Sequence, residues 1–65
     1  MKDKILNAIH RIVERKLNSG EAFLCAHSIE VAHELKMNAR EVEIIAKDIK
    51  EIKTHLTING KYYEA

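Results

Sequence analysis

The sequence predicts a mainly α-helical domain in which three helices are followed by a C-terminal β-hairpin. Apolar residues recur every three or four positions through most of the chain, which is typical of helices that bury one face. Near residue 56 this spacing changes to alternation, and Asn59-Gly60, a strong hairpin signal, follows. The 65 residues contain no internal repeat or linker-like segment, so we expect a single domain over residues 1–65.

The composition is that of a small folded domain, with 46% apolar and 32% charged residues. The formal net charge of +1 argues against strong DNA binding, because an excess of Lys and Arg usually supplies most of the affinity for phosphates. So short a chain leaves little room for a catalytic cleft beside a core, and we do not predict an enzyme. Small size also favours self-association, and we expect a homodimer.

The single cysteine, Cys25, excludes an internal disulfide and a multi-cysteine zinc site. The chain has no leader-like segment and no run of about 18 apolar residues. We therefore expect a soluble, cytoplasmic protein with no membrane partner, and we identify no small-molecule substrate and no cofactor.

The first helix is predicted over about residues 2–17. Asn18-Ser19-Gly20 ends it, since glycine accepts the left-handed conformation common at helix ends. Its buried face is expected to carry Ile5, Leu6, Ile9, Ile12, Val13 and Leu17.

The second helix is predicted over about residues 21–36 and the third over about residues 39–53. Apolar residues of the second cover a wide arc, which suits a central helix with a neighbour on each side. Asn38 and Glu41 have capping-box spacing at the start of the third. The expected apolar residues are Leu24, Cys25, Ile29, Val31, Ala32 and Leu35 in the second helix, and Val42, Ile45, Ala46, Ile49 and Ile52 in the third.

Only a tight turn fits between these two helices, because just Met37 and Asn38 separate them. Ala32 is small and lies where the helix backbones would approach most closely. This pattern predicts a helix-turn-helix, whose second helix often enters a DNA groove. Lys36 stands where such turns usually carry glycine, so it must adopt a disfavoured conformation or the turn must have another geometry.

The hairpin is predicted over about residues 55–64. With Asn59-Gly60 as its turn, Leu56 lies opposite Tyr63 and Thr57 lies opposite Tyr62. An isolated two-stranded ribbon is barely stable, so Leu56, Ile58 and one tyrosine should pack on the helices. Three helices and a hairpin together have the outline of a reduced winged helix.

The segment from Leu24 to Leu35, continuing to Ile52-Lys53, resembles a group of short prokaryotic helix-turn-helix proteins. In their pattern a cysteine precedes an isoleucine-alanine helix, a valine-containing helix follows, and the exit is rich in isoleucine. The resemblance covers about half of the chain and implies DNA binding or a regulatory role. The tail departs from it, because His55-Leu56-Thr57-Ile58 replaces a second cysteine and a Gly-Leu-rich end.

We therefore predict a small DNA-binding or transcription-associated protein that places its third helix in the major groove of double-stranded DNA. Arginine reads guanine edges or binds phosphates, lysine binds phosphates, and glutamate accepts hydrogen bonds from cytosine. The predicted DNA-binding residues are Asn38, Arg40, Glu43, Lys47, Lys50 and Lys61. Acidic residues interrupt this surface, so a solvated face of Glu/Lys pairs is the competing interpretation.

The alternative function is a protein-interaction or dimerisation module on the same scaffold that does not bind nucleic acid. Ile44 lies on the far side of the third helix from its apolar face, and together with Tyr62 and Tyr63 it marks the predicted interface.

No catalytic or metal site is predicted. His27, Glu30 and His33 share one face of the predicted second helix, but sites of this kind need ligands from several helices. We expect Cys25 to be a small core residue, since free cysteine is commonly buried.

Overall fold

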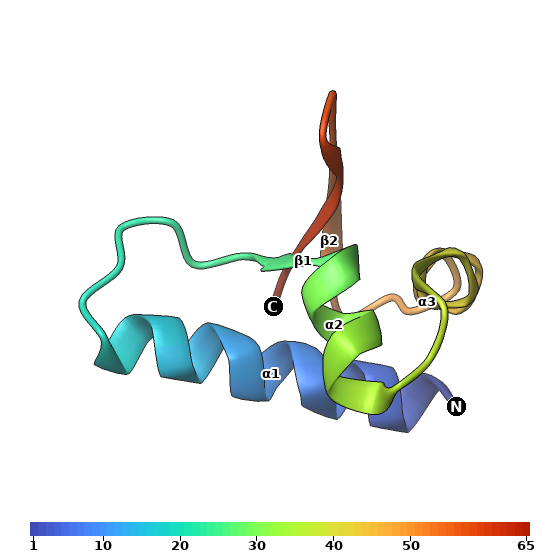
Figure 1. The fold of residues 1–65 in the computed structure, drawn as a ribbon, viewed down its shortest axis with the longest axis horizontal. Helices are drawn as coiled ribbons and strands as arrows, with labels where there is room; N and C mark the ends of the chain where they lie inside the picture. The colour runs from blue at the N-terminus through green and yellow to red at the C-terminus, as the bar shows by residue number, and fades with distance from the viewer.

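The computed structural model describes all 65 residues and contains three helices and a three-stranded antiparallel sheet (Figure 1). The prediction of a mainly α-helical domain is therefore wrong in class, because a third strand joins the hairpin and makes the fold mixed α/β. In chain order the elements are α1 (Lys2–Asn18), β1 (Ala26–His27), α2 (Ser28–Leu35), α3 (Ala39–Ala46), β2 (Lys53–Thr57) and β3 (Gly60–Glu64). The strands lie in the order β1-β3-β2. No helix has both the length and the apolar character needed to cross a bilayer.

Helix α1 forms where predicted, and its apolar face provides one wall of the core, but Leu17, which was expected on that face, is exposed. Ile5, Ala8, Ile9 and Ile12 are buried on it. Gly20 follows with a φ of +76°, which lets the chain turn after the helix. In Figure 1 α1 lies along one side of the molecule, and the β2–β3 hairpin projects from the other.

The second helix begins later than predicted, at Ser28, and residues 21–25 are not helical. The apolar run over residues 22–26 is as compatible with a buried strand as with a helix, and its periodicity alone does not separate the two. Pairing of Ala26 with Tyr63 and of His27 with Tyr62 favours the strand. Helix α2 still contacts both α1 and α3, as expected of a central helix.

His27 provides the N-cap of α2, which the sequence pattern does not suggest. Its Nδ1 accepts a hydrogen bond from the Ile29 N–H (3.0 Å), and the Glu30 carboxylate accepts one from the His27 N–H (2.9 Å). At α3, Asn38 caps as predicted by accepting from the Arg40 N–H (2.8 Å), but Glu41 does not complete a capping box. The capping box, in which two residues bond to each other's backbone, therefore forms at α2 and not at α3.

A tight turn joins α2 to α3, as predicted. Lys36 has φ 54° and ψ 47°, the left-handed conformation, so the turn keeps the geometry usually assigned to glycine. The Met37 N–H donates to the Ala32 carbonyl (2.9 Å), so this carbonyl in the last turn of α2 has a hydrogen-bond partner.

Helix α3 ends at Ala46, not near residue 53 as predicted. The N–H groups of Asp48 and Ile49 bond to carbonyls three residues earlier, so the chain tightens into turns beyond the helix. Ile49 remains buried there. The predicted helix cannot reach residue 53, because Lys53 pairs with Glu64 at the start of the hairpin.

The hairpin lies at the predicted place, but its strand register is not the predicted one. Its turn is Ile58-Asn59, so Thr57 lies opposite Gly60 and Leu56 lies opposite Lys61. Gly60 has a φ of +125°, and a Cβ there would lie 2.9 Å from Nε2 of His27. This glycine therefore supplies both the backbone conformation and the space for the His27 ring.

The core lies between the three helices and one face of the sheet. Tyr63 is 1% exposed and is the tyrosine that packs on the helices. Leu56 and Ile58 do not, being 77% and 100% exposed, because the hairpin extends beyond the helices (Figure 1). The buried hydrophobic cluster consists of Ile5, Ala8, Ile9, Ile12, Ala26, Val31, Ala32, Val42, Ala46, Ile49 and Tyr63.

Replacing Lys36 with glycine should stabilise the domain. The left-handed conformation costs an L-residue about 1–2 kcal/mol, part of which glycine's larger unfolded-state entropy offsets, so we expect a net gain of about 0.5–1 kcal/mol. Urea unfolding measures the change. Lys36→Ala is the matched control, since it keeps the Cβ and should give no gain; equal stabilisation by both variants would contradict the explanation.

Replacing Gly60 with alanine should destabilise the domain more than the same change at Gly20. Both glycines have positive φ, but nothing lies within 4 Å of a Cβ at Gly20, whereas the His27 ring lies within 3.0 Å of one at Gly60. We expect a loss of about 1 kcal/mol for Gly20→Ala from backbone strain and about 2 kcal/mol or more for Gly60→Ala. Thermal unfolding compares them, and equal losses would show that the His27 contact is unimportant.

Candidate nucleic-acid interface

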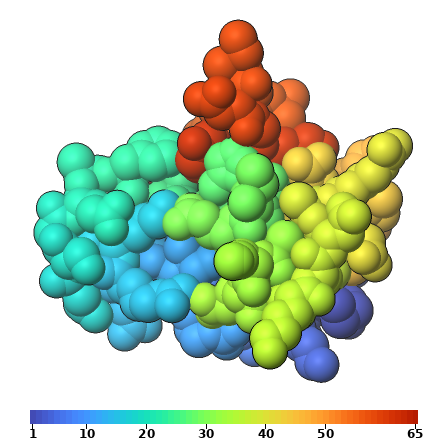
Figure 2. Space-filling model, in the orientation of Figure 1, coloured from blue at the N-terminus to red at the C-terminus, as the bar shows by residue number.

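One face of α3 and the neighbouring strand β3 enclose a shallow hollow. Arg40, Glu43, Ile44 and Lys47 have the spacing that aligns side chains along one side of a helix. With Lys61 of β3 they line a hollow of about 470 Å³. Figure 2 shows the hairpin rising beside the part of the surface formed by α3.

Arg40 and Lys47 in this hollow differ in their ion pairing from the three basic side chains of α1 that pair with acids on α2. Arg40 and Lys47 are exposed and have no acidic oxygen within 4.0 Å. In contrast, Arg11 (2.8 Å) and Arg15 both bind Glu34, and hydrogen bonds first from Arg11 and then from Arg15 lower the pKa of that carboxyl. The positive charges of Arg40, on α3, and of Lys47, at its C-terminal end, are therefore available to an anionic partner.

Glu43 is the only acid in the hollow, and it is tied to neighbouring elements. Its Oε2 accepts a hydrogen bond from the buried Ser28 hydroxyl (3.1 Å), and its Oε1 lies 4.0 Å from the Lys61 ammonium. These contacts join α3 to the start of α2 and to β3. Glu43 is thus placed to position Lys61 and to offset part of its charge.

The structure brings together four of the six predicted DNA-binding residues: Arg40, Glu43, Lys47 and Lys61. Asn38 lies at the leading end of α3, with its side-chain oxygen used in capping. Lys50 lies elsewhere, in a hollow at the start of α1 that also contains the acids Asp3, Asp48 and Glu51. The premature end of α3 explains this separation.

The three predicted interface residues do not form one patch. Ile44 is 61% exposed and lines the α3 hollow, whereas Tyr63 is in the core. Tyr62 makes edge-to-face contacts with the rings of Phe23 (5.1 Å) and His27 (4.6 Å). Since neighbouring strand residues point to opposite faces, Tyr62 is directed away from the face that carries Tyr63.

The sequence interpretation missed the exposed tip of the hairpin. Leu56 and Ile58 were expected in the core because they are apolar and alternate with Thr57. Their exposure follows from the length of the hairpin, which the periodicity alone does not reveal.

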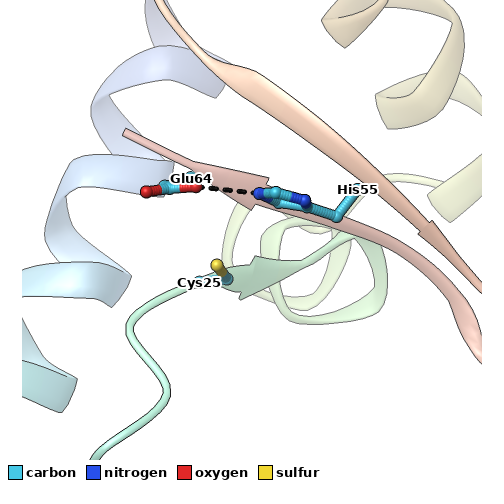
Figure 3. A group of neighbouring side chains, drawn as sticks. All are labelled: Cys25, His55 and Glu64. Carbon is cyan, nitrogen blue, oxygen red and sulfur yellow. Dashed lines mark hydrogen bonds and ion pairs between the residues drawn. The ribbon is translucent and has the colours of Figure 1, made fainter.

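The structure also gathers side chains that can hold a metal, and they are not the ones weighed in the sequence. Cys25, His55 and Glu64 converge beside the sheet (Figure 3). Burial, followed by the nearby Glu64 carboxylate, raises the pKa of the Cys25 thiol, which disfavours a role as a free nucleophile.

The histidines and glutamate considered in the sequence have other roles or none. His27 caps α2, Glu30 binds the Lys16 ammonium (2.8 Å), and His33 is exposed. The new group was not found because strand register, not sequence spacing, brings residues 25, 55 and 64 together.

No protein-family model, curated protein or solved structure matches this chain.

Tyr63 should make stability fall at high pH. Its hydroxyl has no hydrogen-bond partner in the protein, and burial, with a smaller effect of the Glu43 charge, raises its pKa to about 12 from 10.0. The unfolded chain loses this proton near the ordinary pKa and the folded chain only near the raised one. The free energy of unfolding should therefore fall between these values and be unaffected by Tyr63 below them.

Urea unfolding across the alkaline range tests this prediction. Tyr63→Phe should remove the part of the decrease that is due to Tyr63, whereas the control Tyr62→Phe should retain it. The prediction fails if the two variants have the same alkaline profile.

Proposed function

We propose that this chain is a small DNA-binding protein with a role in transcription regulation, built as a helix-turn-helix with a hairpin wing. One observation carries the proposal: the unpaired cations Arg40, on α3, and Lys47, which follows α3 directly, share a hollow with Lys61 of β3. A helix that presents cations beside a projecting hairpin offers two adjacent elements to a duplex.

The connection between α2 and α3 supports the use of α3 as the recognition helix. The left-handed Lys36 ends α2 sharply, and Asn38 starts α3 after it. An α-helix with its side chains is about 10–12 Å in diameter, which fits the major groove of about 12 Å width. The eight residues of α3 give a helix about 12 Å long to lie in it.

Each side chain of the hollow has a chemical role in this proposal. Arg40, near the leading end of α3, reads a guanine edge or binds a phosphate, and Lys47 neutralises phosphate. Ile44, between them on the same face, suits contact with a thymine methyl group. Lys61 adds a backbone contact from the wing, while Lys50 takes no part because it lies among acids.

The proposed assembly on DNA is a homodimer. A short α3 contacts few base pairs, and two-fold pairing of subunits is the usual way in which small helix-turn-helix proteins extend their site. Strand β2 lies at an edge of the sheet and has an unpaired side for such a contact.

The alternative is an interaction module that does not bind nucleic acid. The exposed Ile44, Leu56 and Ile58 favour it, because they place apolar surface on α3 and the hairpin. The tyrosines do not contribute to it, since Tyr63 is buried and Tyr62 packs within the chain.

Titration of a fluorescent mixed-sequence duplex at several salt concentrations tests the proposal. Affinity should fall steeply with salt, because each neutralised phosphate contributes about −0.9 to the slope of log K against log salt. The double substitution Arg40→Ala and Lys47→Ala should weaken binding and reduce the magnitude of the slope by about 2.

The matched control is the double substitution Lys2→Ala and Lys4→Ala, which removes the same charge from α1. It should leave the slope nearly unchanged, and circular dichroism should show that both variants fold. Absence of binding at low salt, or equal effects of the two variants, would refute the proposed DNA contact. Sedimentation with and without duplex measures the oligomeric state. A dimer that does not bind the duplex would favour the interaction module.

A further inference from the structure

Three potential metal ligands from separate strand segments meet at one side of the sheet. Cys25 immediately precedes β1, His55 lies in β2 and Glu64 lies in β3. One ligand atom from each, a sulfur, a ring nitrogen and a carboxylate oxygen, lie within 4.8 Å of one another. Figure 3 shows the His55 and Glu64 side chains in contact, with the Cys25 sulfur beside them.

We propose that Cys25, His55 and Glu64 bind a single transition-metal ion of the zinc class. Thiolate, imidazole and carboxylate are the three side-chain ligands that Zn²⁺ uses in proteins. The thiolate and carboxylate charges together balance those of the divalent ion. Three protein ligands leave the fourth tetrahedral position for water or an exchangeable ligand.

The distances require only small side-chain movements. Bonds of about 2.0–2.3 Å to a tetrahedral ion place the ligand atoms about 3.3–3.7 Å apart. The His55 Nε2 and Glu64 Oε1 atoms are now 2.8 Å apart and must separate slightly, while the sulfur must approach them. The His55 and Glu64 side chains are 40% and 53% exposed, so both are free to adjust.

Binding involves no oxidation or reduction. The Cys25 thiol releases its proton to solvent as the sulfur–metal bond forms. Nε2 of His55, which donates its hydrogen to Glu64, gives up that hydrogen to solvent, and the neutral ring carries its one hydrogen on Nδ1 when Nε2 binds the ion. Two bonds to the ion then replace the hydrogen bond between His55 and Glu64. The nearby Lys16 ammonium does not oppose the ion strongly, because it binds the Cys25 carbonyl (2.7 Å) and the Glu30 carboxylate (2.8 Å).

The position of the ligands gives the ion a structural consequence. The segment before β1 would be linked to β2 and β3 through one centre, where the two hairpin strands join the helical body. The ion should therefore stabilise the folded chain and the attachment of the hairpin, whether or not the chain binds DNA.

Titration of the reduced chain with Co²⁺, followed by displacement with Zn²⁺, tests the site. One equivalent should produce thiolate-to-cobalt charge-transfer absorption and the intense visible bands of a four-coordinate ion, and Zn²⁺ should remove both. Excess Zn²⁺ should raise the melting temperature in proportion to the logarithm of its concentration.

Three ligand variants and two controls make the test specific. Cys25→Ser should abolish the charge-transfer band. His55→Gln and Glu64→Gln change a partly exposed and an exposed residue, so they keep the test valid if Cys25→Ser does not fold. Each should weaken binding at least as much as the roughly 10–100-fold loss typical of outer-shell partners. His10→Gln and His33→Gln, on exposed helix surfaces, should have no effect. The proposal is overturned if no charge-transfer band appears, or if the ligand variants bind Co²⁺ as tightly as the controls do.

Discussion

The His27 side chain joins the helical and strand parts of this fold. Its Nδ1 accepts from the Ile29 N–H at the start of α2, which leaves the Nε2 hydrogen to donate to the Asn59 carbonyl in the hairpin turn (2.9 Å). Its ring also packs against Tyr62. Gly60 leaves the space that this arrangement requires. A single imidazole thus caps α2 and also contacts the hairpin beside it. An N-cap residue ordinarily bonds only to its own helix.

That connection determines where α3 lies relative to the hairpin. Helix α2 ends at the left-handed Lys36, and α3 follows after a short turn and packs Val42 and Ala46 against the core. Glu43 then bonds to Ser28 beside the cap and faces Lys61 in β3. The proposed DNA-contacting face therefore rests on the same junction as the fold.

The overall charge of +1 is unevenly distributed, because some basic side chains are paired with acids and others are not. Glu34 and Glu30 on α2 bind three of the basic side chains of α1, Arg11, Arg15 and Lys16. Burial by itself would raise the pKa of Glu30, but hydrogen bonds from Lys16 and the His27 N–H outweigh it and lower that pKa. Arg40 and Lys47 have no such partners. A nearly neutral chain can thus present a locally basic hollow.

The sequence by itself determined the first helix, the cap at Asn38 and the presence of a hairpin, because each depends on local periodicity or on one residue's conformational preferences. At Lys36 it left two possibilities, a disfavoured conformation or another turn geometry, and the structure shows the left-handed one. It also identified the cations of α3. Only the tertiary structure decided that residues 26–27 form a strand, that α3 stops at Ala46, that the hairpin turn is Ile58-Asn59, and that residues 25, 55 and 64 meet. These outcomes depend on pairing between segments distant in sequence, and a short apolar run carries no information about which partner it will find.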